Sequence, residues 1–167
     1  MPCSPPLPMR RLKWSHENYY LAIFGNPAGG GDWGYKVEGH HLSINFTFHG
    51  DQLAVTPMFV GTDPAEYTML EYAGWRVLSK EEDEGLKLVQ SLSPAQKTKA
   101  TASTEVPGDI ITAAESGKRL VDYWGIRVSE LSAAQQETVK AMIREFVFNL
   151  GYEKAQAEYS KIMAAGI

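Results

Sequence analysis

Cysteine is almost absent from this sequence, which has only Cys3 among its 167 residues. A single thiol excludes an internal disulfide and a structural zinc site built on paired thiolates. Long apolar runs are absent too, since nowhere do about eighteen apolar residues follow one another, as a membrane-spanning helix requires. The N-terminus also lacks an apolar run of signal-peptide length. We therefore expect a cytoplasmic protein without a membrane partner.

The sequence also lacks an excess of basic residues. Lysine and arginine total 16 against 20 aspartate and glutamate residues, so the formal net charge is −4 and the pI is near 5.6. A weakly acidic chain without a long basic run is a poor match for nucleic acid or an anionic membrane surface. We therefore do not expect nucleic acid or an anionic membrane as the main partner, and the partner expected is a small-molecule substrate or ligand.

The length and the 44% hydrophobic content are typical of one globular domain with one core. Residues 1–17 carry four prolines and no hydrophobic periodicity. We expect them to form a disordered or extended leader, and residues 18–167 to form a single domain.

Strand patterns dominate the first half of that domain. Short runs rich in β-branched and aromatic residues, several of them alternating apolar and polar positions, predict strands at 19–25, 33–39, 41–50 and 51–61, with a further short strand at 74–79. Gly50 and Asp51 have the chemistry of a tight hairpin turn. The glycine-rich connection at 26–32 lacks the spacing of a phosphate-binding loop and is predicted to be a plain hairpin connection.

Helical patterns follow in the second half. Three capping boxes predict helix starts, and they consist of Ser79 with Glu82, Ser93 with Gln96, and Ser132 with Gln135. Strands followed by helices predict the α+β class, with an antiparallel sheet of about four or five strands and three or four helices packed on one of its faces. The segments 92–98 and 131–138 resemble each other, which indicates either shared capping chemistry or a duplicated unit.

Three of the four histidines fall within residues 34–50. Interpreted as strand, this stretch places Glu38 and His40 on one face about 7 Å apart, with His41 on the other face. His41 and His49 are eight residues apart, which is roughly 26 Å along a strand, so they cannot bind the same metal ion.

Three interpretations of the histidines remain open. His40 could be a structural histidine hydrogen-bonded to Glu38, or Glu38 and His40 could form a catalytic or binding pocket. His40 and His41 could also bind a divalent transition metal, whose other ligands would come from His16 or a distant carboxylate. Candidate substrate contacts are Arg76 for an anion, Trp33 as an aromatic wall and Asn45 as a polar group.

Four runs of sequence resemble a known family: YYLAIFGNP, WGYKVEGHHLSINFTF, TPMFVGTDPAEY and GWRVLSKEEDEGLKLVQSLSPAQ. They are similar to an uncharacterised bacterial and fungal family known as domain of unknown function thirty-five hundred. The resemblance covers residues 19–100 closely and the later helices more loosely. It implies no particular reaction, because none is established for the family.

The block around EGHH carries most of the resemblance, which therefore favours a functional role for Glu38, His40 and His41. The resemblance also implies members of roughly twice this length, with a later segment in which HxH precedes an Arg-Asp pair and a DFG-like run. That segment has no matching position here. If the family uses both histidine segments together, this chain holds half of the site.

We hypothesise a small-molecule enzyme, hydrolytic rather than redox and metal-assisted if His40 and His41 bind an ion. Glu38 would orient His40, which would act as a general base or as a metal ligand that activates water. The alternative is a non-catalytic binding or assembly module that forms homo-oligomers through an open sheet edge or an exposed apolar face.

Overall fold

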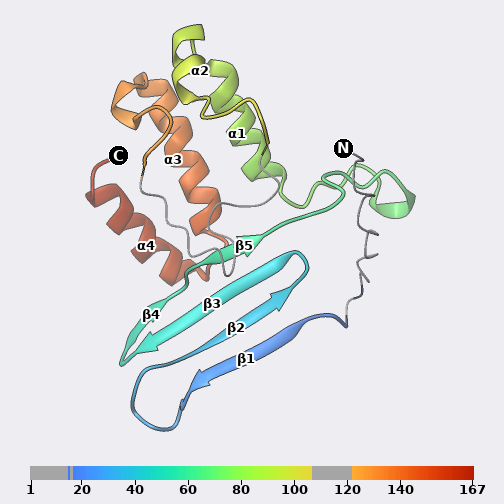
Figure 1. Ribbon diagram of the computed structural model, residues 1–167, viewed down its shortest axis with the longest axis vertical. Helices are drawn as coiled ribbons and strands as arrows, with labels where there is room; N and C mark the ends of the chain where they lie inside the picture. The colour runs from blue at the N-terminus through green and yellow to red at the C-terminus, as the bar shows by residue number, and fades with distance from the viewer. Residues whose placement is uncertain (1–14, 16, 107–121) are drawn as a thin grey trace, which may run out of the picture. The chain divides into compact units, whose positions relative to one another are not determined.

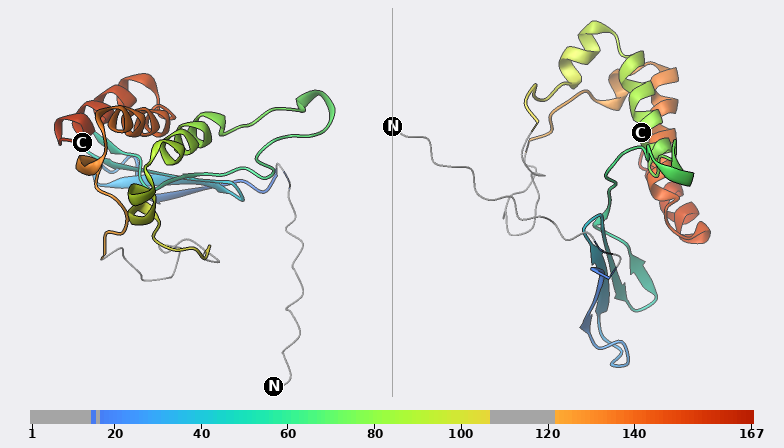
Figure 2. Two further views of the ribbon diagram at one scale, coloured as in Figure 1. Left: turned by 90° about the horizontal axis from the view of Figure 1, so that it is seen from above. Right: turned by 90° about the vertical axis from the view of Figure 1, so that its right-hand side faces the viewer.

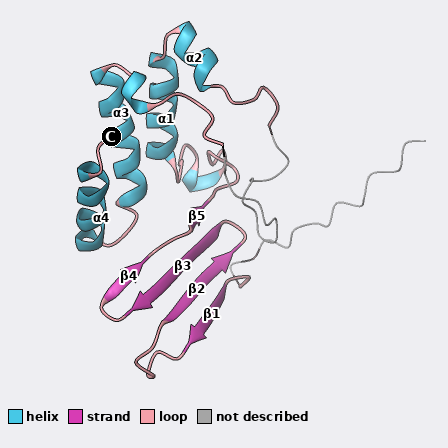
Figure 3. Cartoon of the chain, turned by 60° about the vertical axis from the view of Figure 1, so that its left-hand side comes forward, coloured by secondary structure: helices cyan, strands magenta, loops and turns pink. Residues whose placement is uncertain are grey.

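The structure is a computed structural model that describes residues 15, 17–106 and 122–167 (Figure 1). The chain divides into two compact units, Met1–Val77 and Leu78–Ile167. The first contains the strands and the second contains the four α-helices, which confirms the α+β class (Figure 3). The single domain over residues 18–167 and the packing of helices on one sheet face stay predictions. Most of the predicted leader, residues 1–14 and 16, lies outside the described residues.

The first unit is built on an antiparallel meander. Strands β1 (Tyr20–Gly25), β2 (Trp33–Gly39) and β3 (Leu42–His49) pair in chain order, and β4 (Gln52–Ala54) and β5 (Met58–Val60) both pair with β3. Figure 2 shows these strands as one layer. The prediction of four or five strands is confirmed, as is the turn at Gly50 and Asp51 between β3 and β4.

Strands β4 and β5 occupy the range for which the sequence predicts one continuous strand. β4 pairs with the end of β3 and β5 with its beginning, and the register shifts by one residue between them. Pro57 lies in the break because it has no backbone N–H to donate to a ladder. Its carbonyl instead accepts hydrogen bonds from the backbone N and the Nδ2 of Asn45, at 3.2 and 2.9 Å. The predicted strand is therefore interrupted by a bulge.

The pairing of β2 with β3 gives the sheet an apolar and a polar face. Directly paired residues share a face, and the pairs Trp33 with Phe48, Tyr35 with Phe46 and Val37 with Ile44 define the apolar face. The rings of Trp33 and Phe48 stack at 4.2 Å and those of Tyr35 and Phe46 at 4.4 Å. Such pairs contribute about 0.5–1.5 kcal/mol each beyond burial. The alternate positions form the polar face: Gly34, Lys36, Glu38, Ser43, Asn45, Thr47 and His49.

His40 and His41 form the two-residue turn between β2 and β3. The interpretation of residues 34–50 as one strand, with Glu38 and His40 on the same face, is therefore wrong. The chain reverses here because the reversal aligns the alternating apolar residues of both strands on one face. Ser43, Asn45 and His49 share the polar face of β3.

The predicted strand at 74–79 is absent from the described structure, and residues 74–78 form turns and loop before α1. The 3₁₀ helix η1 (Leu70–Tyr72) precedes them (green in Figure 1). Backbone hydrogen bonds from Tyr67 to Trp75 and from Gly74 to Tyr67 close this segment on itself, at 2.9 and 2.7 Å. Gly74 has a φ of +87°, a conformation outside the range of a strand. The hydrogen bonds within this loop therefore outweigh the strand preference that the alternating apolar residues of this short run predict.

The second unit contains α1 (Ser79–Ser91), α2 (Pro94–Ala100), the 3₁₀ helix η2 (Val128–Glu130), α3 (Ala133–Val147) and α4 (Tyr152–Ala164). Helix α3 packs against α1 and α4. Leu92 and Leu131, which precede the caps of α2 and α3, are buried, as is Ala155 of α4. Among the described residues, no helix is both long and apolar enough to cross a membrane.

Two of the three predicted capping boxes are confirmed, at Ser93 with Gln96 and at Ser132 with Gln135. The box at Ser79 is wrong, because Ser79 is already helical and Leu78 takes the cap position without a side-chain bond. The amides of Gln96 and Gln135 also exchange hydrogen bonds of 3.1 Å in both directions. The similarity between segments 92–98 and 131–138 thus corresponds to two helix starts that bind each other.

Candidate functional site

The predicted catalytic residues lie at one end of the β2–β3 hairpin. The rings of His40 and His41 in the turn are 4.5 Å apart, and the ring of Tyr19 lies 6.0 Å from that of His40. Gly39 lies under the Tyr19 ring, since a Cβ at that position would lie 2.4 Å from Cε1 of Tyr19 and the ring would have to move to accept a side chain there. The backbone N–H of Gly61 donates to the carbonyl of His41 at 2.8 Å and holds the turn against the end of β5.

Glu38 lies on the polar face and forms an ion pair with Lys36. The structure therefore gives the Glu38 carboxylate a lysine partner, whereas the sequence predicted a role in orienting His40. Within the part of the chain that the structure describes, no group of three His, Cys, Asp or Glu side chains could hold a metal ion. The two turn histidines could supply two ligands, and a complete site would need ligands from another source.

The three predicted substrate contacts lie in different places. Asn45 is on the polar face, and the ring of Trp33 is on the apolar face, stacked on Phe48. Arg76 lies in the connection between η1 and α1. Asn45 and Trp33 therefore point to opposite faces of the sheet.

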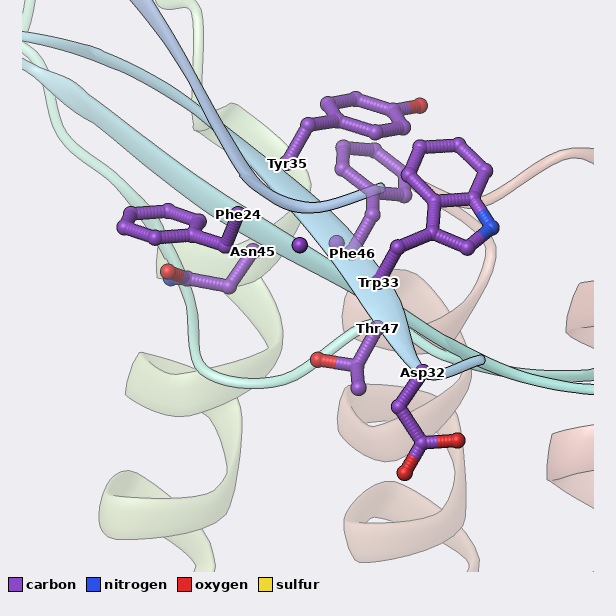
Figure 4. Close-up of a pocket in the computed structure, with 9 residues that line it drawn as sticks. Phe24, Asp32, Trp33, Tyr35, Asn45, Phe46 and Thr47 are labelled. Carbon is purple, nitrogen blue, oxygen red and sulfur yellow. The ribbon is translucent and has the colours of Figure 1, made fainter. Parts of the chain in front are cut away.

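A hollow of about 290 Å³ lies near the other end of the hairpin. The buried Gly34 lines this hollow, and its backbone approaches Phe46 so closely that a Cβ there would lie 2.5 Å from the Phe46 carbonyl oxygen. In Figure 4 the side chains of Asn45, Thr47 and Asp32 point away from the rings of Trp33, Tyr35 and Phe46. The complete lining is Phe24, Gly25, Asp32, Trp33, Gly34, Tyr35, Asn45, Phe46 and Thr47.

Asp32 at the edge of this hollow contacts His49, the last residue of β3. Asp32 Oδ1 and His49 Nδ1 are 2.6 Å apart, and both side chains are well exposed. A carboxylate bound to Nδ1 fixes the imidazole tautomer and leaves Nε2 as the proton acceptor. The pair therefore has the geometry of a general base with its orienting group.

The sequence contains a signal that could have found this pair. The hairpin register that pairs Trp33 with Phe48 places the preceding residue, Asp32, beside the following residue, His49. Recognising that the turn lies at His40 and His41 would have predicted the contact. The histidine pattern around EGHH does not indicate this pair, because Asp32 lies in a glycine-rich connection outside the predicted strands.

The hollow combines apolar and polar walls. Phe24 of β1 supplies an aromatic wall, and Thr47 and Asn45 supply a hydroxyl and an amide. The hydrogen bond from Asn45 Nδ2 to the Pro57 carbonyl orients the amide. A site with one carboxylate–imidazole pair, two polar groups and the Phe24 ring suits a small polar molecule, because such ligands are held by few placed polar groups.

A larger hollow of about 600 Å³ lies between α1 and α3 in the second unit. Its polar groups bind one another: Gln135 donates to the Ser91 carbonyl at 2.8 Å, and the hydroxyls of Ser132 and Thr138 make capping and intrahelical bonds. Glu137 binds Lys140 at 2.7 Å. These contacts stabilise the helices, so the hollow near His49 is the stronger candidate site.

A comparison with protein-family models matches residues 7–166 to the family described as protein of unknown function (DUF3500). The chain belongs to this family. The match to DUF3500 extends beyond residues 19–100, where the sequence resemblance is closest. No curated protein and no solved structure matches the chain. Membership of DUF3500 confirms the resemblance and supplies no reaction, so the geometry of the site carries the functional argument.

Proposed function

We propose that the sheet unit binds a small polar molecule over Gly34 and acts on it by acid–base chemistry, with hydrolysis as the simplest reaction. The observation that carries this proposal is the 2.6 Å contact between Asp32 and His49 at the edge of the hollow. Hydrolysis requires a base that activates water, and an oriented neutral imidazole is such a base near neutral pH.

In the proposed reaction, Asp32 accepts the Nδ1–H of His49, and His49 Nε2 takes a proton from a water molecule. The water attacks an electrophilic carbon or phosphorus of a ligand that contacts Asn45 and Thr47. The protonated imidazole, stabilised by the Asp32 carboxylate, then returns the proton to the leaving group.

The experiment compares hydrolysis of p-nitrophenyl acetate and p-nitrophenyl phosphate by the wild-type chain and by His49→Gln and Asp32→Asn. We expect His49→Gln to lower kcat/KM by about a hundredfold or more, the range for loss of a general base, with a smaller loss for Asp32→Asn. His40→Gln is the matched control, because His40 is also exposed. Equal losses in His49→Gln and His40→Gln would indicate unspecific catalysis by surface imidazoles and contradict the proposal.

The turn histidines support a second candidate function, a metal-assisted hydrolase centred on Glu38, His40 and His41. The observation in its favour is the 4.5 Å distance between the two imidazole rings. Such a pair could supply two ligands of a divalent transition metal, with the remaining ligands from a second chain or a substrate.

Elemental analysis of protein purified without an affinity tag tests this candidate. The second candidate predicts a transition metal near one per chain or one per dimer, lost in the double variant His40→Ala/His41→Ala. Equal metal content in both proteins would count against it. Cytoplasmic location and a small-molecule partner stay predictions.

A further inference from the structure

Strand β1 forms one edge of the sheet, and among the described residues only β2 pairs with it. Its sequence, YLAIFG, contains no charged residue and no proline. Four of its side chains are more than half exposed: Tyr20, Leu21, Ile23 and Phe24. Natural edge strands usually carry lysine, proline or a bulge that prevents pairing with another chain. β1 has none of these protections, so its edge is suited to pairing.

The side chains of β1 are arranged symmetrically about Ala22. An aromatic residue lies two positions away on each side, Tyr20 and Phe24, and an aliphatic residue lies one position away on each side, Leu21 and Ile23. An antiparallel pair of two such strands centred on Ala22 opposes every aromatic residue to an aromatic residue and every aliphatic residue to an aliphatic one. Matched cross-strand pairs of this kind stabilise a sheet.

We propose that two copies of the chain pair through β1 in antiparallel register about a two-fold axis at Ala22, which joins the two sheets into one. The partner that pairs with the β1 edge is a second copy of the chain, because a two-fold interface requires a surface that is complementary to itself. β1 meets this requirement, since its aromatic residues face aromatic residues and its aliphatic residues face aliphatic ones. Ala22 suits the position on the axis, because the Ala22 side chains of the two copies face each other there. A methyl group is small enough to let the two strands approach closely.

The pairing has a consequence for the hollow over Gly34. Phe24 lines the hollow and pairs with Gly34 across β1 and β2. In the proposed register Phe24 opposes Tyr20 of the partner subunit on the same sheet face. The partner therefore extends the aromatic wall of the site. The pairing itself does not rest on the proposed acid–base chemistry.

The first test is the mass of the full chain in solution by light scattering across a range of concentrations. The expected result is a dimer of twice the 18.5 kDa chain mass. Ala22→Glu, which opposes two carboxylates at the axis, should shift the mass to that of a folded monomer. Ala28→Glu in the β1–β2 connection should leave the dimer intact. A monomeric wild-type chain, or a dimer that Ala22→Glu and Ala28→Glu affect equally, would overturn the proposal.

The second test reads the register by disulfide cross-linking in a Cys3→Ser background. Ala22→Cys opposes its own copy and should give a covalent dimer on mild oxidation, because directly opposed Cβ atoms lie within about 5.5 Å. Ile23→Cys opposes Leu21 of the partner subunit and should give at least tenfold less dimer by itself. Cross-linking that is equal at both positions, or stronger at Ile23→Cys, would overturn the register and with it the proposed interface.

Discussion

Gly34 is the residue on which the hollow depends. A Cβ at this position would lie 2.5 Å from the backbone oxygen of Phe46, and backbone cannot move aside cheaply. We predict that Gly34→Ala destabilises the chain by about 2 kcal/mol or more, in the range of steric overpacking. Chemical denaturation measures this change.

Gly31→Ala is the matched control for this prediction. An added Cβ at Gly31 meets no atom within 4 Å. Its effect should therefore lie within about 0.5 kcal/mol of zero. Equal destabilisation by both substitutions would show that the close approach of Gly34 to Phe46 is not what constrains the strand.

Leu70 carries backbone strain. Its φ is +60°, a left-handed conformation that bulky residues rarely adopt, and its side chain is 89% exposed. We predict that Leu70→Asn stabilises the chain by roughly 1 kcal/mol, because asparagine tolerates this conformation and little burial is lost.

Met69→Asn provides the comparison for Leu70. Met69 is similarly exposed at 72% but has an ordinary φ of −131°. A thermal melt should show a higher Tm for Leu70→Asn and no gain for Met69→Asn. A gain in both variants would mean that removal of exposed apolar surface, rather than relief of strain, is responsible.

At the scale of elements, the amide pair of Gln96 and Gln135 joins two helix starts. Gln135 is buried, binds the Ser91 carbonyl at 2.8 Å and exchanges hydrogen bonds with Gln96. We predict that Gln135→Ala costs about 1–3 kcal/mol, because it leaves buried partners unsatisfied. A double-mutant cycle with Gln96→Ala should give a coupling energy of about 1 kcal/mol. If the losses of stability in the two single variants simply added up in the double variant, the pairing of Gln96 with Gln135 would be contradicted. Gln90→Ala is the neutral control, because Gln90 is exposed.

Helix α4 predicts a pH dependence of stability. Hydrogen bonds from Lys154 and then Lys161 hold the pKa of Glu158 below its usual value of 4.5. A carboxyl whose pKa is lowered by folding stabilises the fold above its unfolded pKa, and this stabilisation is lost as the pH falls through the lowered value. Glu158→Gln should therefore lower Tm by a few degrees at most at neutral pH, since Glu158 and both lysines stay partly accessible to solvent. The difference should vanish in strong acid.

The two lysines allow a graded control for this prediction. Lys154 lies 2.7 Å and Lys161 3.1 Å from the Glu158 carboxylate. Thermal melts between acid and neutral pH should show a larger effect for Lys154→Met than for Lys161→Met. A Tm difference for Glu158→Gln that persists unchanged into acid would contradict the assignment.

The elements were largely predictable because their signals are local. Alternating residues predicted β1 to β3, and the Ser–Gln spacing predicted the starts of α2 and α3. The β2–β3 turn was harder to predict, since His40 and His41 lack the Asn-Gly or Asp-Gly chemistry typical of two-residue hairpins. The predicted strand at 74–79 is wrong because backbone hydrogen bonds from Tyr67 to Trp75 and from Gly74 to Tyr67 close a local loop that the residue pattern does not reveal.

At the scale of the whole molecule, the order of strands and helices predicted the α+β class correctly. The sequence could not place the site in the same way, because a site joins side chains whose proximity depends on strand register. Once the hairpin register is known, Thr47, Asp32 and His49 gather at one end of the polar face, and Asn45 lies near the middle of β3. His40 and His41 gather at the other end, in the turn.

The most direct test of the central claim is a ¹H–¹⁵N NMR screen of the full chain with small polar acids, amides and phosphate esters. The predicted result is that binding compounds shift the backbone amide signals of Gly34, Asn45 and Thr47, and that Asp32→Asn abolishes these shifts. Binding that shifts only the signals of the His40–His41 turn, and that persists in Asp32→Asn, would contradict the claim and place the site at the turn.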